Sequence, residues 1–287
     1  MSISEIKIAT EVVRRSKRRR SAILDSIGGL VLGVFVLIAL LPFLFMVVTS
    51  IQRTNIITIV FDPAKLTLDN FVRVFDGGGF GAALVTSLIV VTLACLVNAV
   101  VSSLAAYAFA KKPFPGSDAL FWLYIATMMV PSQVTLIPLF IMMRDLGLLN
   151  THIALFLPVI NAFGVFLIRQ FMESLPDDML EAARIDGASE LQIFGRIVLP
   201  AIRPAIIALT VFTFLTTWND FLWPLVSITN DDMQTVTLAV ANLQGRNLTD
   251  FGLVMAGATV SFLVPLVMYL LLQKQFVEGI TSSSVKG

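Results

Sequence analysis

The residues that could do chemistry are few, and their types limit what that chemistry is. His152 is the single histidine and Cys95 the single cysteine among the 287 residues. A His/Cys metal site and an intrachain disulfide each need more of these residues than the sequence holds. The motif G-x-x-x-x-G-K-[ST], which cradles nucleotide phosphates, is also missing. A membrane-embedded enzyme is therefore a poor interpretation, and we expect this chain to bind neither a cofactor nor a metal.

The most informative polar residues form one loop, residues 174–200, between two apolar stretches. Ser174, followed by a proline and two aspartates, predicts the cap of a helix, because proline and acidic residues suit a first turn. Gly187 predicts the end of that helix, since glycine readily adopts the left-handed conformation found there. Ser189 with Gln192 predicts a capping box for a second helix. We expect two short helices joined at a glycine elbow.

Five polar residues stand out within the apolar stretches: Asn98, Gln133, Asn161, Asn219 and Asp220. Polar side chains at membrane depth are costly and usually face the bundle interior or a cavity. Each is open to two interpretations, the wall of a polar pathway for a solute or a contact between helices. For any single residue the helix contact is favoured. Asn219 and Asp220 are also candidates for a helix cap or a gate.

Long apolar stretches position these residues. Hydrophobic residues make up 57% of the chain and charged residues 14%, whereas soluble domains average about 45–50% and about 25%. Continuous apolar character favours helices over strands in a membrane. The sequence therefore predicts an all-α membrane protein of six transmembrane helices, with a kink in the third at Pro131 and Pro138. The six stretches cover roughly 27–50, 81–109, 118–143, 153–171, 201–226 and 252–272.

Basic residues are distributed unevenly around these stretches. The net charge is +1, yet 15 of the 20 Lys and Arg residues lie on one side of the predicted membrane. Because basic residues concentrate in cytoplasmic loops, both termini are expected in the cytoplasm. The predicted parts are a basic cytoplasmic segment (1–26), a transmembrane domain (27–273) and a cytoplasmic tail (274–287). The run Arg14–Arg20 is interpreted as a topology anchor beside the lipid bilayer, not as a nucleic-acid site.

The loop also has a specific spacing: Glu181-Ala182-Ala183, three residues, Gly187, nine residues, Ile197, one residue, then Leu199-Pro200. This pattern resembles the EAA loop of permease subunits of binding-protein-dependent ABC importers. The stretches 130–133, 217–225 and 275–287 resemble those of carbohydrate importers, most closely the six-span second permease of the maltose transporter. The resemblance implies that the ATPase-coupling residues are Glu181, Ala182, Ala183, Asp186, Gly187, Ile197, Leu199 and Pro200.

The resemblance further implies a type I ABC importer permease fold in the plasma (inner) membrane of a prokaryote. It implies four partners: a second permease subunit, two cytoplasmic ATPase subunits that bind ATP and Mg, and an extracytoplasmic solute-binding protein. Glu181 suits an arginine on the ATPase, and the small side chains of Ala182 and Ala183 let the helix enter a cleft. The loop would transmit force, with no chemistry of its own.

One alternative class is a self-sufficient secondary transporter or channel. Such a protein needs ion-coupling carboxylates within its spans, and Asp220 is nearly the only candidate. It also has no need of an EAA loop. The sequence leaves the solute open among sugars, polyols and glycerol-phosphate-like compounds.

Overall fold

The computed structural model describes residues 3–54, 62–76, 79–246 and 250–284, and the side chains within residues 26–273 except those at 55–61, 77–78 and 245–249. The described residues form helices and connecting turns, with an isolated antiparallel bridge between Gln52 and Leu66 in place of a sheet. The predicted all-α class is confirmed.

Within the part of the chain that the structure describes, three helices are long and apolar enough to cross a membrane without a break. They are α1 (Ile3–Ser50), α3 (Phe80–Lys111) and α14 (Phe251–Ser284), with candidate spans at Ser26–Ser50, Phe80–Lys111 and Phe251–Gln273. These match the first, second and sixth predicted stretches. The helices α1 and α14 also run across the boundaries predicted at residues 26 and 273.

The third predicted stretch bends at Pro131, as predicted, but the bend is a break between two helices and not a kink within one. Helix α4 (Ser117–Ala126) continues through a 3₁₀ turn, and α5 (Ser132–Asp145) then leaves at 102°. Val130 is extended, with ψ at 117°. Pro131 follows it, and the ring of a proline disfavours the helical conformation at the residue before it.

The fourth stretch is also two pieces, bent by 46°. Helix α6 (His152–Phe156) passes through the 3₁₀ turn Leu157–Val159, and α7 (Ala162–Glu173) begins after Asn161. Asn161 has an extended backbone, and its Oδ1 accepts a hydrogen bond from the Phe163 N–H at 3.0 Å. An asparagine in this conformation starts a new helix instead of continuing the old one.

The fifth stretch was predicted to continue as one helix to residue 226, but α11 (Arg203–Trp218) ends earlier. Asn219 leaves the helical conformation, and both its backbone N–H and its Nδ2 donate to the Leu215 carbonyl, at 3.2 Å and 2.8 Å, so its side chain turns back onto the helix it ends. The short α12 (Leu222–Ser227) follows. The described chain therefore holds three unbroken spans, or six when each bent pair counts as one.

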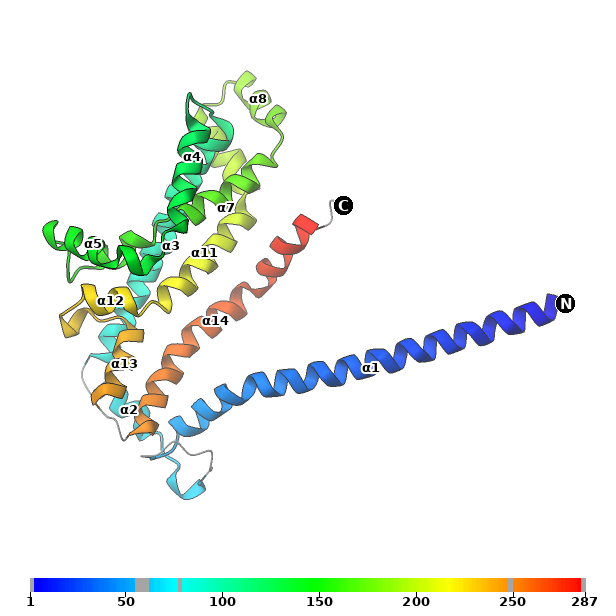
Figure 1. The fold of residues 1–287 in the computed structure, drawn as a ribbon, viewed down its shortest axis with the longest axis horizontal. Helices are drawn as coiled ribbons and strands as arrows, with labels where there is room; N and C mark the ends of the chain where they lie inside the picture. The colour runs from blue at the N-terminus through cyan, green and yellow to red at the C-terminus, as the bar shows by residue number, and fades with distance from the viewer. Residues whose placement is uncertain (1–2, 55–61, 77–78, 247–249, 285–287) are drawn as a thin grey trace.

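Figure 1 shows the arrangement of these elements. Helices α3, α7 and α11 pack together as the centre of the bundle. The loop helix α8 (Asp177–Ile185) lies at one end, and α2 (Asp69–Asp76) and α13 (Val236–Arg246) lie at the other, beside the start of α14. Buried apolar side chains form three clusters among the described residues. One packs the end that carries α8, one packs the end with α2 and α13, and one packs α5, α6 and α12 against the bundle.

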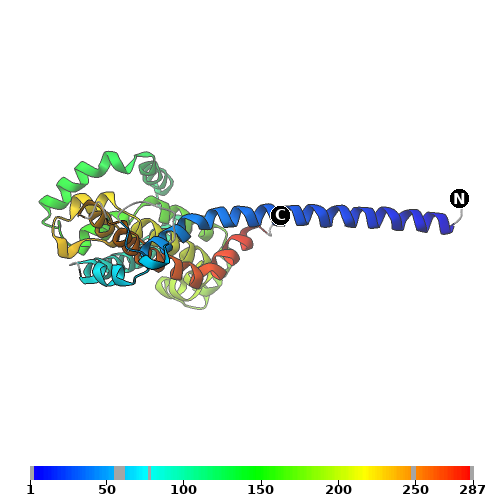
Figure 2. The same ribbon diagram turned by 90° about the horizontal axis from the view of Figure 1, so that it is seen from below.

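Helix α1 packs against α14 near its C-terminal end, and its N-terminal part extends away from the bundle (Figure 2). Phe43 stacks on Phe262 of α14 with ring centroids 4.7 Å apart. The most apolar window of Ser26–Ser50 buries none of its residues within the chain. Such a continuous apolar surface has to be covered by lipid or by another chain.

Candidate coupling loop and solute cavity

The elbow of the loop is a helix end locked by glycine. Gly187 has φ at +82°, the left-handed region. Its N–H donates to the Arg184 carbonyl, and the Ala188 N–H donates to the Ala183 carbonyl, both at 3.0 Å. These two bonds form a Schellman motif, which satisfies carbonyls that would otherwise be free. The predicted glycine elbow is confirmed.

The first cap was predicted wrongly. Ser174 does not cap α8; it follows α7, and its Oγ donates back to the Phe171 carbonyl at 2.7 Å. Helix α8 begins after Pro176 with no side-chain cap, and its two aspartates in the first turn supply the negative charge there. The Ser174 hydroxyl therefore bonds to the last turn of α7 and not to the first turn of α8.

The second helix begins as predicted. Ser189 and Gln192 form a capping box at the start of α9 (Glu190–Ile193). The chain continues through a π-helical turn, Phe194–Val198, into α10 (Leu199–Ala201). It then bends by 74° at Ile202 into α11. The loop is therefore two helical arms, one on each side of the glycine.

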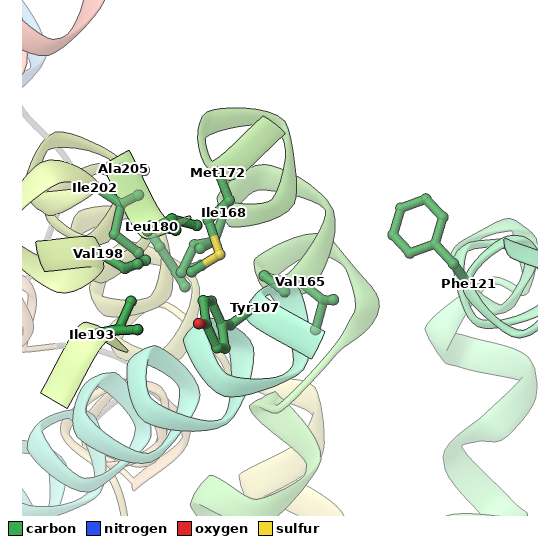
Figure 3. Packing of buried hydrophobic residues seen from close by; sticks show 12 residues of the cluster. Tyr107, Phe121, Val165, Ile168, Met172, Leu180, Ile193, Val198, Ile202 and Ala205 are labelled. Atoms are coloured by element: carbon green, nitrogen blue, oxygen red, sulfur yellow. The ribbon is translucent and has the colours of Figure 1, made fainter. Parts of the chain in front are cut away.

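Buried side chains hold both arms against the bundle (Figure 3). Leu180 of α8 and Ile193 of α9 are almost fully buried, as are Val198 and Ile202 after them. They pack in one cluster with side chains of the bundle, namely Tyr107, Val165, Ile168, Met172 and Ala205. Because protein interiors are close-packed, this cluster fixes the inner face of the loop.

The outer face of the loop has no such cover. Glu181 is exposed and makes no ion pair with any described residue. Ile185 and Leu191 flank the elbow with 86% and 79% of their surfaces exposed. Two large aliphatic side chains held outward beside a free carboxylate are typical of a surface that binds another protein.

The predicted coupling residues divide between these two faces. One set is exposed: Glu181, Ala182, Asp186, Gly187 and Pro200. The other set is half-buried and packs against the cluster of Figure 3: Ala183, Ile197 and Leu199. The exposed residues of the motif thus form the outer surface of the loop, and the half-buried ones attach the loop to the bundle.

A group of residues that the sequence did not single out ties the loop to α3. The Glu190 carboxylate accepts a hydrogen bond from the Tyr107 hydroxyl at 2.8 Å and pairs with Lys112 Nζ at 2.5 Å. Arg184 Nε donates to it at 3.0 Å. Hydrogen bonds from Lys112 and Tyr107 hold the pKa of Glu190 down at about 2. We call these four residues the Glu190 clamp.

A second tie lies beside the clamp. Lys111 Nζ donates to the Leu175 carbonyl and to Asp177 Oδ1, both at 2.7 Å. Its side chain is only 4% exposed. Lys111 and Lys112 were part of the count of basic residues that indicated topology. In the structure they bind the first residues of α8 and α9, the starts of the two arms. The available signal was Tyr107 four residues before Lys111 on one side of an apolar helix, with a second lysine directly after the helix end.

A cavity of about 400 Å³ lies where the broken stretches meet. It is lined by Asn161 from the break before α7, Asp220 from the break after α11, and Ser132 and Thr135 from α5. Thr216 and Thr217 of α11 add two further hydroxyls. Two of the five polar residues predicted for a pathway thus share one cavity with four hydroxyl side chains, a chemistry suited to hydrogen-bonding a polar solute.

The other three lie elsewhere. Asn98 is 2% exposed, and its side chain accepts from Ser102 Oγ at 3.0 Å and donates to Thr213 Oγ1 of α11 at 2.9 Å. This geometry fits the helix-contact interpretation. Gln133 is exposed on α5, and Asn219 is bonded to its own helix. Neither lines the cavity.

Comparison with known proteins identifies the family of the chain. The family model described as "Binding-protein-dependent transport system inner membrane component" matches residues 98–281, which include both the loop and the cavity breaks. The chain belongs to this family of permeases.

Individual relatives agree with this placement. The permease is 34% identical over 282 residues to the arabinooligosaccharides transport system permease protein AraQ of Halalkalibacterium halodurans, covering 94% of this chain and all of that one. It is 33% identical over 263 residues to the lactose transport system permease protein LacG of Rhizobium radiobacter, covering 90% and 96%.

A solved structure gives the fold. The permease superimposes with a TM-score of 0.79 on a chain of a bacterial ABC transporter involved in the import of the acidic polysaccharide alginate. The match is 25% identical and covers 90% of this chain and 98% of that one. The type I ABC importer permease fold is thereby confirmed, and the permease is a component of an inner-membrane importer.

Proposed function

We propose that the permease forms half of the translocation pathway of a sugar importer and is driven by ATPase subunits through residues 174–200. The observation that carries this proposal is the locked loop, whose outer face exposes Ile185, Leu191 and a Glu181 that makes no ion pair with the described residues. The sugar transport permeases among its relatives support the solute class.

The loop surface supports docking of an ATPase. Glu181 is a charge without an ion pair among the described side chains, and an arginine on the partner would give it a charge-assisted hydrogen bond. The ATPase subunits would bind ATP and Mg, and this chain would receive the movement. A second permease subunit would supply the other half of the pathway, and a solute-binding protein outside the membrane would deliver the sugar. A structure of a bacterial alginate ABC transporter in complex with an alginate pentasaccharide-bound periplasmic protein supports this last partner.

The orientation follows from the same docking. The loop has to lie in the cytoplasm to reach the ATPases. Because it joins the fourth and fifth of six spans, both termini would lie on the same, cytoplasmic side. The 15 Lys and Arg residues on the loop side support this topology. The cavity then lies towards the outer half of the bundle, on the side from which the sugar would arrive.

The test is co-purification and uptake. A tagged permease expressed with its neighbouring transport genes is expected to bring down an ATPase and a second permease. Vesicles holding that complex are expected to accumulate one of three probe sugars, an arabino-oligosaccharide, lactose or raffinose, only with internal-side ATP and the solute-binding protein. A lone chain that moves sugar with an ion gradient would contradict the proposal and indicate a secondary transporter.

The first prediction concerns Glu181. Glu181→Gln keeps the shape of the side chain and removes its charge, so ATP-driven uptake is expected to fall at least about tenfold through loss of the ion pair with the ATPase. The measurement is initial uptake per assembled complex. The control is Asp145→Asn, an exposed carboxylate on the opposite half of the molecule that pairs only with adjacent Arg144. Equal rates for both variants would show that Glu181 does not engage the ATPase.

The second prediction separates cavity residues from helix contacts. Asn161→Asp and Asp220→Asn keep the oxygen that bonds to the backbone but change what faces the cavity. Each is expected to lower maximal uptake per folded molecule about fivefold, the effect of one or two solute hydrogen bonds. Asn98→Ala is expected to lower the amount of folded permease with uptake per molecule unchanged. Wild-type uptake by both cavity variants would exclude the cavity from the pathway.

A further inference from the structure

Besides the apolar cluster of Figure 3, the loop is joined to the bundle in two different ways. By chain connection it follows α7 and precedes α11, and the second of these joints is a 74° bend. Ile202 at that bend has φ at −93° and ψ at 9°, outside the helical region. A joint of this kind interrupts the helical hydrogen bonds, so continuity of the chain alone does not fix the angle between the loop and α11.

By side-chain contact the loop is joined to α3, which is distant in sequence. Lys111 binds the first residue of α8, and Lys112 binds the first residue of α9. Arg184 links the two arms to each other through Glu190. The end of α3 therefore holds both arms of the elbow at once, and the Glu190 carboxylate accepts three bonds in all, from Lys112, Arg184 and the Tyr107 hydroxyl.

Helix α3 is the element best suited to carry movement away from the loop. Its 32 residues form one unbroken helix, about 48 Å long at about 1.5 Å per residue. At its middle, Asn98 bonds to Thr213 of α11. Near its other end, Val90 packs in the buried cluster with Trp223, which lines the cavity. One rigid helix thus touches the loop, α11 and the cavity wall.

We propose that Glu190 is a positioning residue that clamps the coupling loop to α3, so that α3 transmits movement of the loop to the cavity. The proposal rests on the proposed function for its physiological meaning, but the clamp itself is a property of this chain. The low pKa of Glu190 agrees with it, because the hydrogen bonds from Lys112 and Tyr107 that lower this pKa are bonds of the clamp itself.

The experiment uses the assembled importer in proteoliposomes, with native Cys95 replaced by serine. Spin labels on Arg196→Cys, an exposed position on the second arm away from the docking face, and Pro113→Cys, just beyond α3, report the distance from the loop to the helix. The readouts are the width of that distance distribution, with and without ATP, and the number of sugar molecules taken up per ATP hydrolysed. The variants are Glu190→Gln, Lys112→Ala and Lys112→Arg.

Glu190→Gln and Lys112→Ala are expected to broaden the distance distribution and to lower uptake per ATP at least fivefold, with assembly intact. Lys112→Arg, which keeps the charge, is expected to restore both readouts. The matched control is Asp69→Asn, which removes an ion pair of similar exposure with Arg53 at the other end of the molecule. It should change neither readout.

The outcomes separate the clamp from the proposed function. A narrow distribution and wild-type uptake per ATP in Glu190→Gln would overturn the clamp. A broadened distribution that Lys112→Arg does not narrow would also overturn it, because the effect would then be a general loss of structure. If the wild-type complex shows no ATP-driven uptake, the proposed function fails, while the distance distributions still decide whether Glu190 holds the loop.

Discussion

Gly187→Val is expected to reduce ATP-driven uptake at least about tenfold while the permease remains inserted in the membrane. Gly187 has φ at +82°, and a left-handed conformation costs an ordinary residue roughly 1–2 kcal/mol, more when the side chain is β-branched. A Cβ at this position meets no neighbouring atom within 4 Å, so the cost is conformational alone. The valine variant should open the two elbow bonds and shift Ile185 relative to Leu191.

The matched variant is Gly187→Asn. Asparagine tolerates the left-handed region, as Asn150 in this chain does with φ at 58°. It is expected to keep most of the uptake, together with the amount of ATPase that co-purifies. If both variants transport alike, the elbow conformation has no part in coupling. If both fail alike, contact of the added side chain with the ATPase, and not backbone strain, is the cause.

Gly164→Ala is expected to destabilise the folded bundle by about 2–4 kcal/mol, the sum of overpacking and of a disrupted buried hydrogen-bond chain. A Cβ on Gly164 of α7 would lie 2.3 Å from Ser102 Oγ and 3.1 Å from Asn98 Oδ1 of α3. The bond chain from Ser102 through Asn98 to Thr213 cannot persist with that atom present. The measurement is the thermal denaturation midpoint of the purified permease in detergent.

The compensating variant for this test is Gly164→Ala combined with Ser102→Gly. Removing the Ser102 side chain leaves room for the new methyl group, so the double variant is expected to recover part of the loss. Gly28→Ala serves as the control, because a Cβ there meets nothing within 4 Å. A single variant as stable as the control would mean that α3 and α7 do not approach as closely as the structure has them.

Residues with local partners were predictable from the sequence. Ser189 and Gln192 bond within four residues of each other, and Gly187 acts through its own backbone, so their roles follow from spacing alone. Ser174 shows the limit of this reasoning. It lies between two helices, and its hydroxyl bonds to the preceding helix, a choice between two local partners that spacing does not decide.

The broken spans were predictable only in part. Proline and apolar length indicated a kink near Pro131, but the 102° angle depends on what α5 packs against after the break. Likewise Asn161 and Asp220, at two separate breaks 59 positions apart, line one cavity only because the bends bring those breaks together. Composition places such residues in a membrane without saying which of them meet.

Six apolar stretches, an uneven distribution of basic residues and the EAA spacing followed from the sequence by itself, because hydrophobic length, flanking charge and helix caps act over short distances along the chain. Only the tertiary structure decided that Asn98 bonds to another helix, that Asn161 and Asp220 share a cavity, and that Glu190 pairs with Lys112. The partners in these contacts are far apart in the chain, and a bond between them exists only after the helices have packed.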